Sequence, residues 1–468
     1  MKKKRERITV SLTLALLLGG CCGVTVQGTQ TVQAEATVEE TAPDKGPIVW
    51  YHDDFDGALA AAKNENKPLV IDVWAPWCHT CLSMQHYVLV DPSMAPLADR
   101  FVWLALDTDK PSSAAVLDKF PVHSWPTFFV ISGVDESVQA RFQGSATIEQ
   151  FRAFLSQGEQ GHLDARAADG TLAKNDPLRL VRKGDRAAVS GDFVGADQAY
   201  GAALASSPAD WPRRPDVLVS QISSRANAEN WLGCVSLALE AMDQTGNSAS
   251  ASDFLAYGNM CEERLEKGDS QRNAFYEQAT LRLEALTSDA DAPLSVDDRS
   301  DALRVLREVQ DKRKYKEAAK KTAETQRALL DDAAANAPSP AAAATFNWPR
   351  AEVYVYLGLG ADLIPALEES TETLPGDYDP PYRLAWVALQ IGDLEKALTS
   401  ARKALGLVYG PRKGRVLNLI AEIHKTSGDL AQYRQALQAM VDLYQSLPEG
   451  QRQPEAMKRA IESLRETK

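Results

Sequence analysis

The chain has 468 residues, of which 44% are hydrophobic and 25% are charged. This composition is typical of a folded globular protein, and the length predicts two or three domains. The formal net charge of −13, without a basic stripe, argues against nucleic acid as a partner. The six cysteines are too few for a fold held together mainly by disulfides. They form three pairs in the sequence: Cys21 with Cys22, Cys78 with Cys81, and Cys234 with Cys261.

The N-terminus has the order of charge and hydrophobicity of an export signal. Basic side chains between Lys2 and Arg7 precede an apolar run from Ile8 to Leu18. Because that run is too short to span a bilayer comfortably, it predicts a cleaved signal peptide and not a transmembrane anchor. We therefore expect an exported protein whose folded part lies outside the cytoplasm, in the cell envelope or periplasm, where disulfide chemistry is possible.

A cysteine directly follows the apolar run. Leu18-Gly19-Gly20-Cys21 resembles the lipobox of bacterial lipoproteins, and this resemblance implies that residues 1–20 are removed and that Cys21 carries a lipid anchor. Residues 21–46, which have no sustained helical or strand period, are predicted to be a flexible tether. An ordinary secretory cleavage after Ala34, which would discard Cys21, is the alternative.

Residues 47–158 alternate between strand and helix patterns. Short apolar runs predict strands at 48–51, 69–74, 101–106, 128–131 and 139–142. Apolar residues at helical spacing predict helices that begin near Phe55, Leu82, Ala114 and Thr147. The resulting order, β-α-β-α-β-α-β-β-α, predicts a compact mixed sheet with a parallel pair and an antiparallel edge.

Cys78 and Cys81 lie between the central strand predicted at 69–74 and the helix that follows it. The N-terminus of a helix offers unpaired N–H groups and partial positive charge, which stabilise a thiolate at Cys78. Cys81 comes one turn later on the same helix face, close enough to form a disulfide with Cys78. The spacing thus predicts a redox-active pair in which Cys78 is the nucleophile and Cys81 the resolving cysteine.

Three features at matching distances identify the family that this domain resembles. The segment Trp74–Cys81 looks like the active-site turn of thioredoxins, and Trp125-Pro126-Thr127 resembles their cis-proline turn. Asp72 stands at the place of their buried acid. The pairs Lys67-Pro68 and Asp91-Pro92 look most like the C-terminal domain of DsbD-type thiol:disulfide interchange proteins.

The resemblance assigns roles to two further residues. Asp72, on a buried strand, would have a raised pKa and would exchange a proton with Cys81; the alternative is a carboxylate satisfied by backbone or water. Pro126, if its peptide bond is cis, would turn the preceding carbonyl toward the thiols and dock a substrate strand. The alternative is a trans proline at the start of an edge strand.

Four neighbouring side chains are expected to modulate the pair: Trp77, His79, Thr80 and Trp125. A charged His79 would stabilise the Cys78 thiolate, whereas a solvated His79 would have little influence. Thr80 adds no charge. Trp77 is expected to form an apolar shelf around the cysteines together with Trp74, and Trp125 is expected to narrow the groove that admits partners.

A metal site is a rival use of the cysteines, with Cys78, His79, Cys81 and His86 as ligands. Structural zinc needs four converging ligands, whereas the neighbours Cys78 and His79 point in different directions at a helix start. We therefore expect no metal and no cofactor other than the Cys78–Cys81 disulfide itself. The sequence leaves the direction of electron transfer open.

After a linker predicted at 159–176, the sequence is helical to its end. The dipeptides Gly191-Asp192, Gly392-Asp393 and Gly428-Asp429, each followed by small residues at helical spacing, are similar to tetratricopeptide repeats. We expect irregular repeats at 177–335, a flexible joint at 336–345, and tetratricopeptide-like repeats at 346–468. An unrepeated helical bundle is the alternative.

Two further expectations concern this helical region. Cys234 and Cys261, on neighbouring predicted helices, could form a structural disulfide or remain two buried thiols. Residues 304–327 are predicted to form one charged helix with a solvated face.

Together these patterns predict an α/β thioredoxin fold followed by an all-α, tetratricopeptide-like solenoid. The function that follows is an exported thiol:disulfide oxidoreductase that uses Cys78 and Cys81. Its partners would be protein thiols or disulfides of the cell envelope, recruited by the repeats, and the membrane through its lipid anchor. The alternative is a non-catalytic assembly scaffold whose thioredoxin-like domain and repeats only bind peptides.

Overall fold

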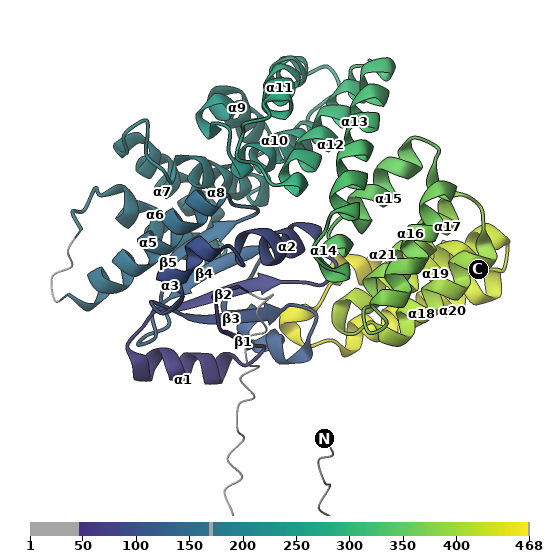
Figure 1. The fold of residues 1–468 in the computed structure, drawn as a ribbon, viewed down its shortest axis with the longest axis horizontal. Helices are drawn as coiled ribbons and strands as arrows, with labels where there is room; N and C mark the ends of the chain where they lie inside the picture. The colour runs from purple at the N-terminus through teal and green to yellow at the C-terminus, as the bar shows by residue number, and fades with distance from the viewer. Residues whose placement is uncertain (1–45, 168–171, 467–468) are drawn as a thin grey trace, which may run out of the picture. The chain divides into compact units, whose positions relative to one another are not determined.

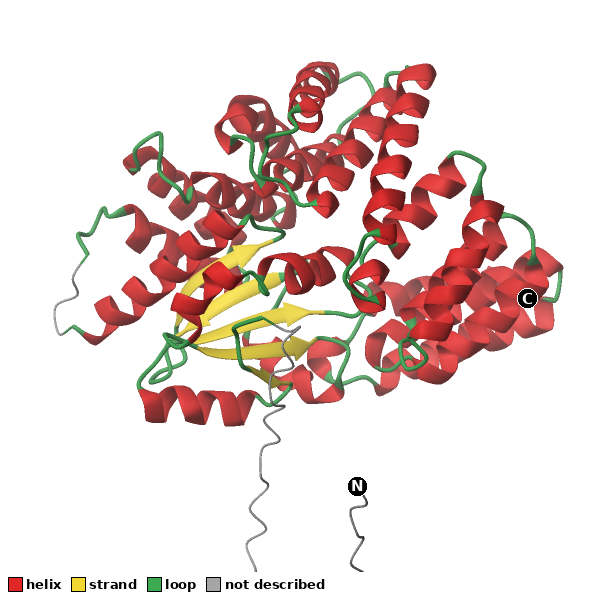
Figure 2. Cartoon of the chain, viewed as in Figure 1, coloured by secondary structure: helices red, strands yellow, loops and turns green. Residues whose placement is uncertain are grey.

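The computed structural model describes residues 46–167 and 172–466. The predicted signal peptide (1–20), the lipid site Cys21 and the tether (21–46, except Gly46) lie outside the described residues. The described chain begins with a five-stranded sheet flanked by helices and continues as helices only (Figures 1 and 2). This arrangement confirms the predicted fold class. Within the described ranges, no helix is both long enough and apolar enough to cross a membrane.

The sheet has the strand order β1-β3-β2-β4-β5. Its strands are β1 (Trp50–His52), β2 (Leu69–Trp74), β3 (Val102–Asp107), β4 (Thr127–Ile131) and β5 (Val138–Gln143). Strands β1 and β2 run parallel to β3, whereas β4 runs antiparallel to both β2 and β5. The five predicted strands are therefore confirmed, with ends that differ by at most two residues, and so are the parallel pairing and the antiparallel edge.

Helices cover both faces of the sheet, so β2 is buried on both sides. The helices of this domain are α1 (Phe55–Glu65), α2 (His79–Ser83), α3 (Ala95–Ala98), α4 (Ala114–Lys119) and α5 (Ile148–Arg166), with a π-helical turn at Met84–Val88 after α2. Leu69, Ile71 and Val73 pack into one apolar cluster, and Val70 packs into the other together with Met84. Because side chains alternate along a strand, Asp72 lies on the face of Val70 and Met84.

Helix α5 is longer than the sequence predicted. It starts at a capping box formed by Thr147 and Gln150 and runs to Arg166, so residues 159–166 are helix and not linker. The glycines of this segment suggested a linker, but they serve close packing. A Cβ atom at Gly158 would lie 2.5 Å from Cγ2 of Val130 on β4, so only glycine lets the helix approach the sheet this closely.

The helical region contains sixteen helices within the described residues. These are α6 (Pro177–Val189), α7 (Phe193–Ser206), α8 (Arg214–Asn227), α9 (Trp231–Ala241), α10 (Ala249–Glu262), α11 (Ser270–Ser288), α12 (Val296–Lys312), α13 (Lys316–Ala335), α14 (Pro340–Ala344), α15 (Asn347–Tyr356), α16 (Gly360–Thr373), α17 (Asp379–Gln390), α18 (Leu394–Leu407), α19 (Lys413–Ser427), α20 (Leu430–Ser446) and α21 (Pro454–Glu466).

The Gly-Asp dipeptides do form repeated turns. Gly191, Gly392 and Gly428 have φ angles of 81°, 84° and 80°, a left-handed conformation that glycine adopts without strain. In each case the following aspartate accepts a hydrogen bond from the backbone three residues later and begins the next helix. The same local rule therefore joins α6 to α7, α17 to α18, and α19 to α20.

Two predictions for the middle of this region differ from the structure. Residues 336–345 contain the short helix α14, capped by Ser339, with Ala342 buried. Residues 304–327 belong to two helices, because α12 ends before Lys314, whose φ is 64°. Arg304 is not on a solvated face, because its guanidinium is part-buried and bonded to Asp301 and Glu308.

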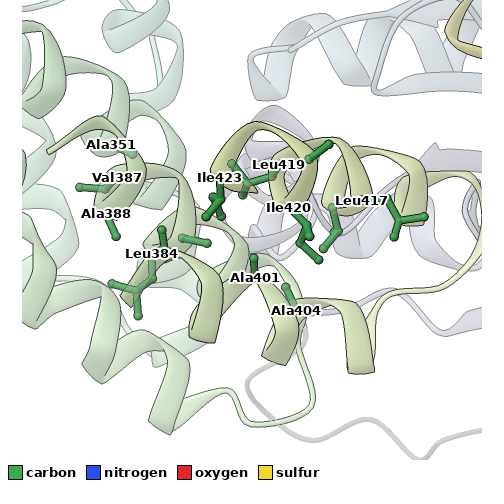
Figure 3. Close-up of a cluster of buried hydrophobic side chains, with 14 of the residues drawn as sticks. Ala351, Leu384, Val387, Ala388, Ala401, Ala404, Leu417, Leu419, Ile420 and Ile423 are labelled. Atoms are coloured by element: carbon green, nitrogen blue, oxygen red, sulfur yellow. The ribbon is translucent and has the colours of Figure 1, made fainter. Parts of the chain in front are cut away.

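Small residues allow the last helices to pack closely. Ala388 on α17 lies with Ala401 and Ala404 on α18 in a large apolar cluster that also holds Leu384 and Ile420 (Figure 3). In the first half of the region, a disulfide joins Cys234 on α9 to Cys261 on α10 inside a second apolar cluster. The structure thus favours the structural disulfide over two buried thiols.

Candidate active site

The predicted redox pair is a disulfide at the start of α2. Cys78 is the N-cap residue, and its Sγ accepts a hydrogen bond from the backbone N–H of Cys81 at 3.0 Å. The two residues are joined by an S–S bond of 2.11 Å. Cys78 is 6% exposed and Cys81 is 1% exposed, so the first cysteine is the more accessible. This is the arrangement in which the N-terminal N–H groups of a helix stabilise a thiolate at Cys78.

Asp72 lies buried beneath this helix. The amide of Gln85 donates a hydrogen bond to its Oδ2 at 3.2 Å, and its Oδ1 has no hydrogen-bond partner among the described residues. Burial raises the pKa of Asp72 to about 7, against the opposing effect of the Gln85 bond. Gln85 follows Cys81 by four residues along the chain, so Asp72 is anchored to the segment that carries the resolving cysteine. A carboxyl group with a pKa near neutrality can both accept and return a proton.

The proline turn lies against the disulfide. The Trp125–Pro126 peptide bond is cis, so the trans alternative is wrong. The rings of Trp77 and Trp125 pack with their centroids 5.4 Å apart, and both contact the small apolar cluster that holds Cys78. The indole of Trp125 also donates to the hydroxyl of Thr108 at 3.2 Å. Trp74 and Trp77, the predicted shelf, thus pack against the cluster of the two cysteines, and Trp125 packs beside them.

His79 is not a solvated side chain. Its Nδ1 lies 2.8 Å from Oδ1 of Asp297, a residue of α12 that is 218 positions away in the sequence. Burial lowers the pKa of His79, but the carboxylates of Asp297 and Asp301 outweigh burial and raise that pKa to about 9. The imidazole is therefore charged at neutral pH, directly next to Cys78. The hydroxyl of Thr80 lies 3.5 Å from the same Nδ1.

The four residues considered as metal ligands do not form a set, because Cys78 and Cys81 are bonded to each other. A different group, His79 with Asp297 and Asp301, brings its ligand atoms within 4.8 Å of one another. Within this group, Nδ1 of His79 and Oδ1 of Asp297 form an ion pair at 2.8 Å, which joins α2 to α12.

The loop after β3 contains site residues that the sequence analysis missed. Oδ2 of Asp109 accepts hydrogen bonds from the indole of Trp77 and from the hydroxyl of Tyr378, both at 3.0 Å. Burial, together with the charge of Asp107, raises the pKa of Asp109 to about 7. The hydroxyl of Tyr409 donates to Asp107. The sequence does contain a signal for these aspartates, because they come at the carboxyl end of a parallel strand. Binding sites form at that edge of a sheet.

Two arginines from the C-terminal helices approach the same place. Arg383 on α17 donates to the carbonyl of Trp77 at 2.9 Å and is paired with Asp379 at 2.9 Å. The guanidinium of Arg412 lies 4.7 Å from the ring centre of Trp77 and 5.0 Å from that of Tyr382. No spacing in the sequence indicates the two contacts with Trp77, since each joins residues more than 300 positions apart.

These side chains enclose a cavity of about 400 Å³ beside the disulfide. Its walls come from the thioredoxin-like domain and from α15, α17 and the segment that enters α19. The lining consists of Cys78 with its neighbours, four aromatic rings and three arginines: Trp77, Cys78, His79, Thr80, Trp125, Trp348, Tyr382, Arg383, Arg412 and Arg415. A reactive sulfur, apolar walls and cationic groups thus share one opening.

Known proteins resemble the first part of the chain. Residues 49–132 match a family model described as thioredoxin-like. The thiol:disulfide interchange protein DsbD of Pseudoalteromonas atlantica is 30% identical over 112 residues, which are 23% of this chain and 19% of that protein. A thioredoxin H-type of Oryza sativa subsp. indica is 32% identical over 108 residues, which are 21% of this chain and 82% of that protein. The chain thus spans about a fifth of the DsbD protein but most of the thioredoxin.

Among solved structures, a tetratricopeptide repeat protein from Parabacteroides merdae matches with a TM-score of 0.39 and 12% identity. That match covers 61% of this chain and 98% of the other.

Proposed function

Since the chain belongs to the thioredoxin family through the domain that carries Cys78 and Cys81, we propose that it is a thiol:disulfide oxidoreductase that acts on protein substrates. The observation that carries this proposal is the Cys78–Cys81 disulfide at the N-terminus of α2, with Cys78 lining an open cavity. A buried acid whose pKa is about 7 lies beneath the same helix. These are the groups that thiol exchange needs: a stabilised thiolate, a second thiol within reach, and a proton carrier.

In the reducing direction, the Cys78 thiolate attacks one sulfur of a substrate disulfide. A bond forms between Cys78 and that sulfur, and the other substrate sulfur leaves as a thiolate. Asp72 then takes the proton of Cys81, whose thiolate attacks Sγ of Cys78 and releases the second substrate sulfur. Two electrons pass to the substrate, and the Cys78–Cys81 disulfide forms. Oxidation of a substrate dithiol is the same sequence in reverse.

We propose that this chemistry takes place outside the cytoplasm, on a protein anchored through a lipid at Cys21. The basic residues, the apolar run and the cysteine that follows it support this location. The helical region supplies part of the cavity wall, so we assign to it the recruitment and orientation of protein thiols or disulfides.

The test is an exchange assay with insulin and with a dithiol peptide, using the purified mature protein. Cys78→Ser should abolish both reactions, and Cys81→Ser should accumulate mixed disulfides with substrates. As a matched control, Cys234→Ala/Cys261→Ala removes the other disulfide and should leave the exchange rate per folded molecule unchanged. If the wild-type protein exchanges with neither substrate and Cys81→Ser traps none, the enzyme proposal is wrong and the peptide-binding scaffold takes its place.

A further inference from the structure

The cavity beside Cys78 has an excess of positive charge. Arg383 is neutralised by Asp379, and His79 by Asp297. Arg412 and Arg415 also line the cavity, and neither makes an ion pair with any residue that the structure describes. Two guanidinium groups at the opening thus have no counter-charge within ion-pair distance in residues 46–167 and 172–466.

Arg412 is the better placed of the two. It lies over the rings of Trp77 and Tyr382, and its Nε is buried without a hydrogen-bond acceptor among the described residues. Burial, together with the charge of Arg383, lowers the pKa of Arg412, and the carboxylate of Asp379, which is paired with Arg383, opposes them only in part. A cation that is partly withdrawn from water and left without an anion is costly to the folded state. An incoming carboxylate would offset that cost with charge-assisted hydrogen bonds.

The charge is local and not a property of the whole chain. The protein has a formal net charge of −13, so its overall field repels acidic substrates. A preference for acidic substrates would therefore have to come from contacts inside the cavity. The cavity volume of about 400 Å³ is sufficient for the side chains of a short peptide segment around one cysteine.

We propose that the cavity selects peptide segments in which a carboxylate lies within one or two residues of the reacting cysteine. Arg412 and Arg415 would bind the carboxylate while Cys78 exchanges with the cysteine, and Trp77, Trp348 and Tyr382 would pack against the segment. This inference rests on the proposed function, because it names the substrate class of the same site. It assigns part of the specificity to the helical region, which lies outside the thioredoxin-like domain.

The test uses three peptide mixed disulfides that are identical except for the residues flanking the cysteine, which are Asp, Asn or Lys. Each rate of reaction with the reduced protein is divided by the rate of the same peptide with dithiothreitol, which corrects for the reactivity of the peptide itself. In the wild type, the Asp peptide should react about tenfold faster than the Asn peptide, as one charge-assisted hydrogen bond predicts, and the Lys peptide should be slowest.

The variant R412Q/R415Q should reduce the Asp-over-Asn preference to less than about twofold, because the charge-assisted bond is lost. The preference is a ratio of two rates measured on the same variant, so a loss of rate that is common to the Asp and Asn peptides cancels, and thermal unfolding of the variant shows whether it is still folded. The control R402Q removes an exposed arginine of α18 that does not line the cavity, and it should keep the full preference.

A separate binding experiment distinguishes a failure of the substrate preference from a failure of the oxidoreductase proposal. S-methylated forms of the three peptides are titrated by calorimetry into C78S/C81S protein, which cannot exchange. If the wild type exchanges with all three peptides equally and the titrations show equal affinity, the selectivity is overturned and the oxidoreductase stands. If no peptide exchanges but the Asp peptide binds most tightly, the selectivity stands and the oxidoreductase proposal is wrong.

Discussion

The thioredoxin-like domain and the helical region contribute to the site in different ways. The groups assigned to the chemistry, Asp72, Cys78, Cys81 and Pro126, come from one domain and lie within 55 consecutive residues. Several groups that surround this chemistry come instead from helices more than 200 positions further along the chain. They include Asp297, which bonds His79, and Arg383, which bonds the backbone of Trp77.

This difference separates two kinds of control over one disulfide. The local residues decide whether exchange can occur, because they form, break and protonate bonds. The distant residues decide the charge next to Cys78 and the shape of its opening, because they hold His79 and Trp77 in place. If this division is correct, changes in the first set should lower the rate for every substrate. Changes in the second set should alter pKa values, stability or substrate preference.

Asp72→Asn should slow exchange more than any single substitution in the helical region. Without the carboxylate, the attack of Cys81 on the mixed disulfide should slow by about 100-fold, the contribution expected of a general base. In the wild type this step should rise with pH through an apparent pKa near 7, which is the value burial gives Asp72, and the variant should lose that rise. Stopped-flow tryptophan fluorescence measures both the rate of this resolving step and its dependence on pH. An unchanged rate would remove Asp72 from the mechanism.

The same substitution should stabilise the protein at alkaline pH. Since the pKa of Asp72 is raised from 3.8 to about 7 on folding, the folded state holds its proton more tightly than the unfolded state does. The wild type therefore loses stability as pH rises from about 4 to about 7. Above pH 7, Asp72→Asn should be more stable by up to about 4 kcal/mol, and the difference should vanish near pH 4. Denaturant unfolding of the oxidised wild type and variant, above pH 7 and near pH 4, tests whether the difference in stability has this sign.

Asp297→Asn should have the next largest effect. The pKa of His79 is raised from 6.5 to about 9, so the ion pair stabilises the folded state fully below pH 6.5 and this stabilisation is lost as pH rises through 9. The variant should be less stable than the wild type at pH 6 by at most about 3 kcal/mol, and the two should converge near pH 10. Denaturant unfolding across this pH range measures the difference.

Asp297→Asn should also change the pKa of the reduced Cys78 thiol. A neutral His79 no longer stabilises the neighbouring thiolate, so the pKa of the reduced Cys78 thiol should rise in Asp297→Asn. Thiol alkylation rates as a function of pH report this pKa. Glu317→Gln, which alters an exposed carboxylate on α13, is the matched control and should leave both readouts unchanged. A Cys78 pKa equal to that of the wild type would show that the helical region does not tune the redox pair.

The residues of the thioredoxin-like domain could be predicted from the sequence, because strand patterns and cysteine spacing depend only on neighbouring residues. The apolar run 69–74 predicted β2 with its observed ends, and the spacing of Cys78 and Cys81 predicted their disulfide. The cis bond before Pro126 followed from the family resemblance. The end of α5 was missed because glycines that pack against a sheet and glycines that interrupt a helix look alike in a sequence.

The distant set could not be predicted in the same way. The bond between His79 and Asp297 depends on how the seven helices from α6 to α12 fold back so that α12 reaches α2, and no local period in the sequence encodes this. Asp107 and Asp109 were a recognisable signal at the end of β3, yet their partners Tyr409 and Tyr378 were not. The redox residues were therefore predictable from the sequence, whereas the residues of the helical region that contact them were not.

The bond between Tyr378 and Asp109 offers the smallest and most selective test. Tyr378 is 2% exposed, and its hydroxyl shares Oδ2 of Asp109 with the indole of Trp77. Tyr378→Phe removes one donor from a buried acceptor that retains the other, so the free energy of unfolding should fall by about 1 kcal/mol.

Tyr356→Phe is the matched control, because it removes a bond of 3.1 Å to Asp311 from a tyrosine that is 40% exposed. Since solvent can replace an exposed hydrogen bond, its cost should be below about 0.5 kcal/mol. Exchange with a neutral peptide should change less than about twofold in either variant, because Asp72, Cys78 and Cys81 are untouched. A tenfold loss of exchange in Tyr378→Phe alone would mean that the helical region positions the reacting groups themselves, and the division between the two regions would then be wrong.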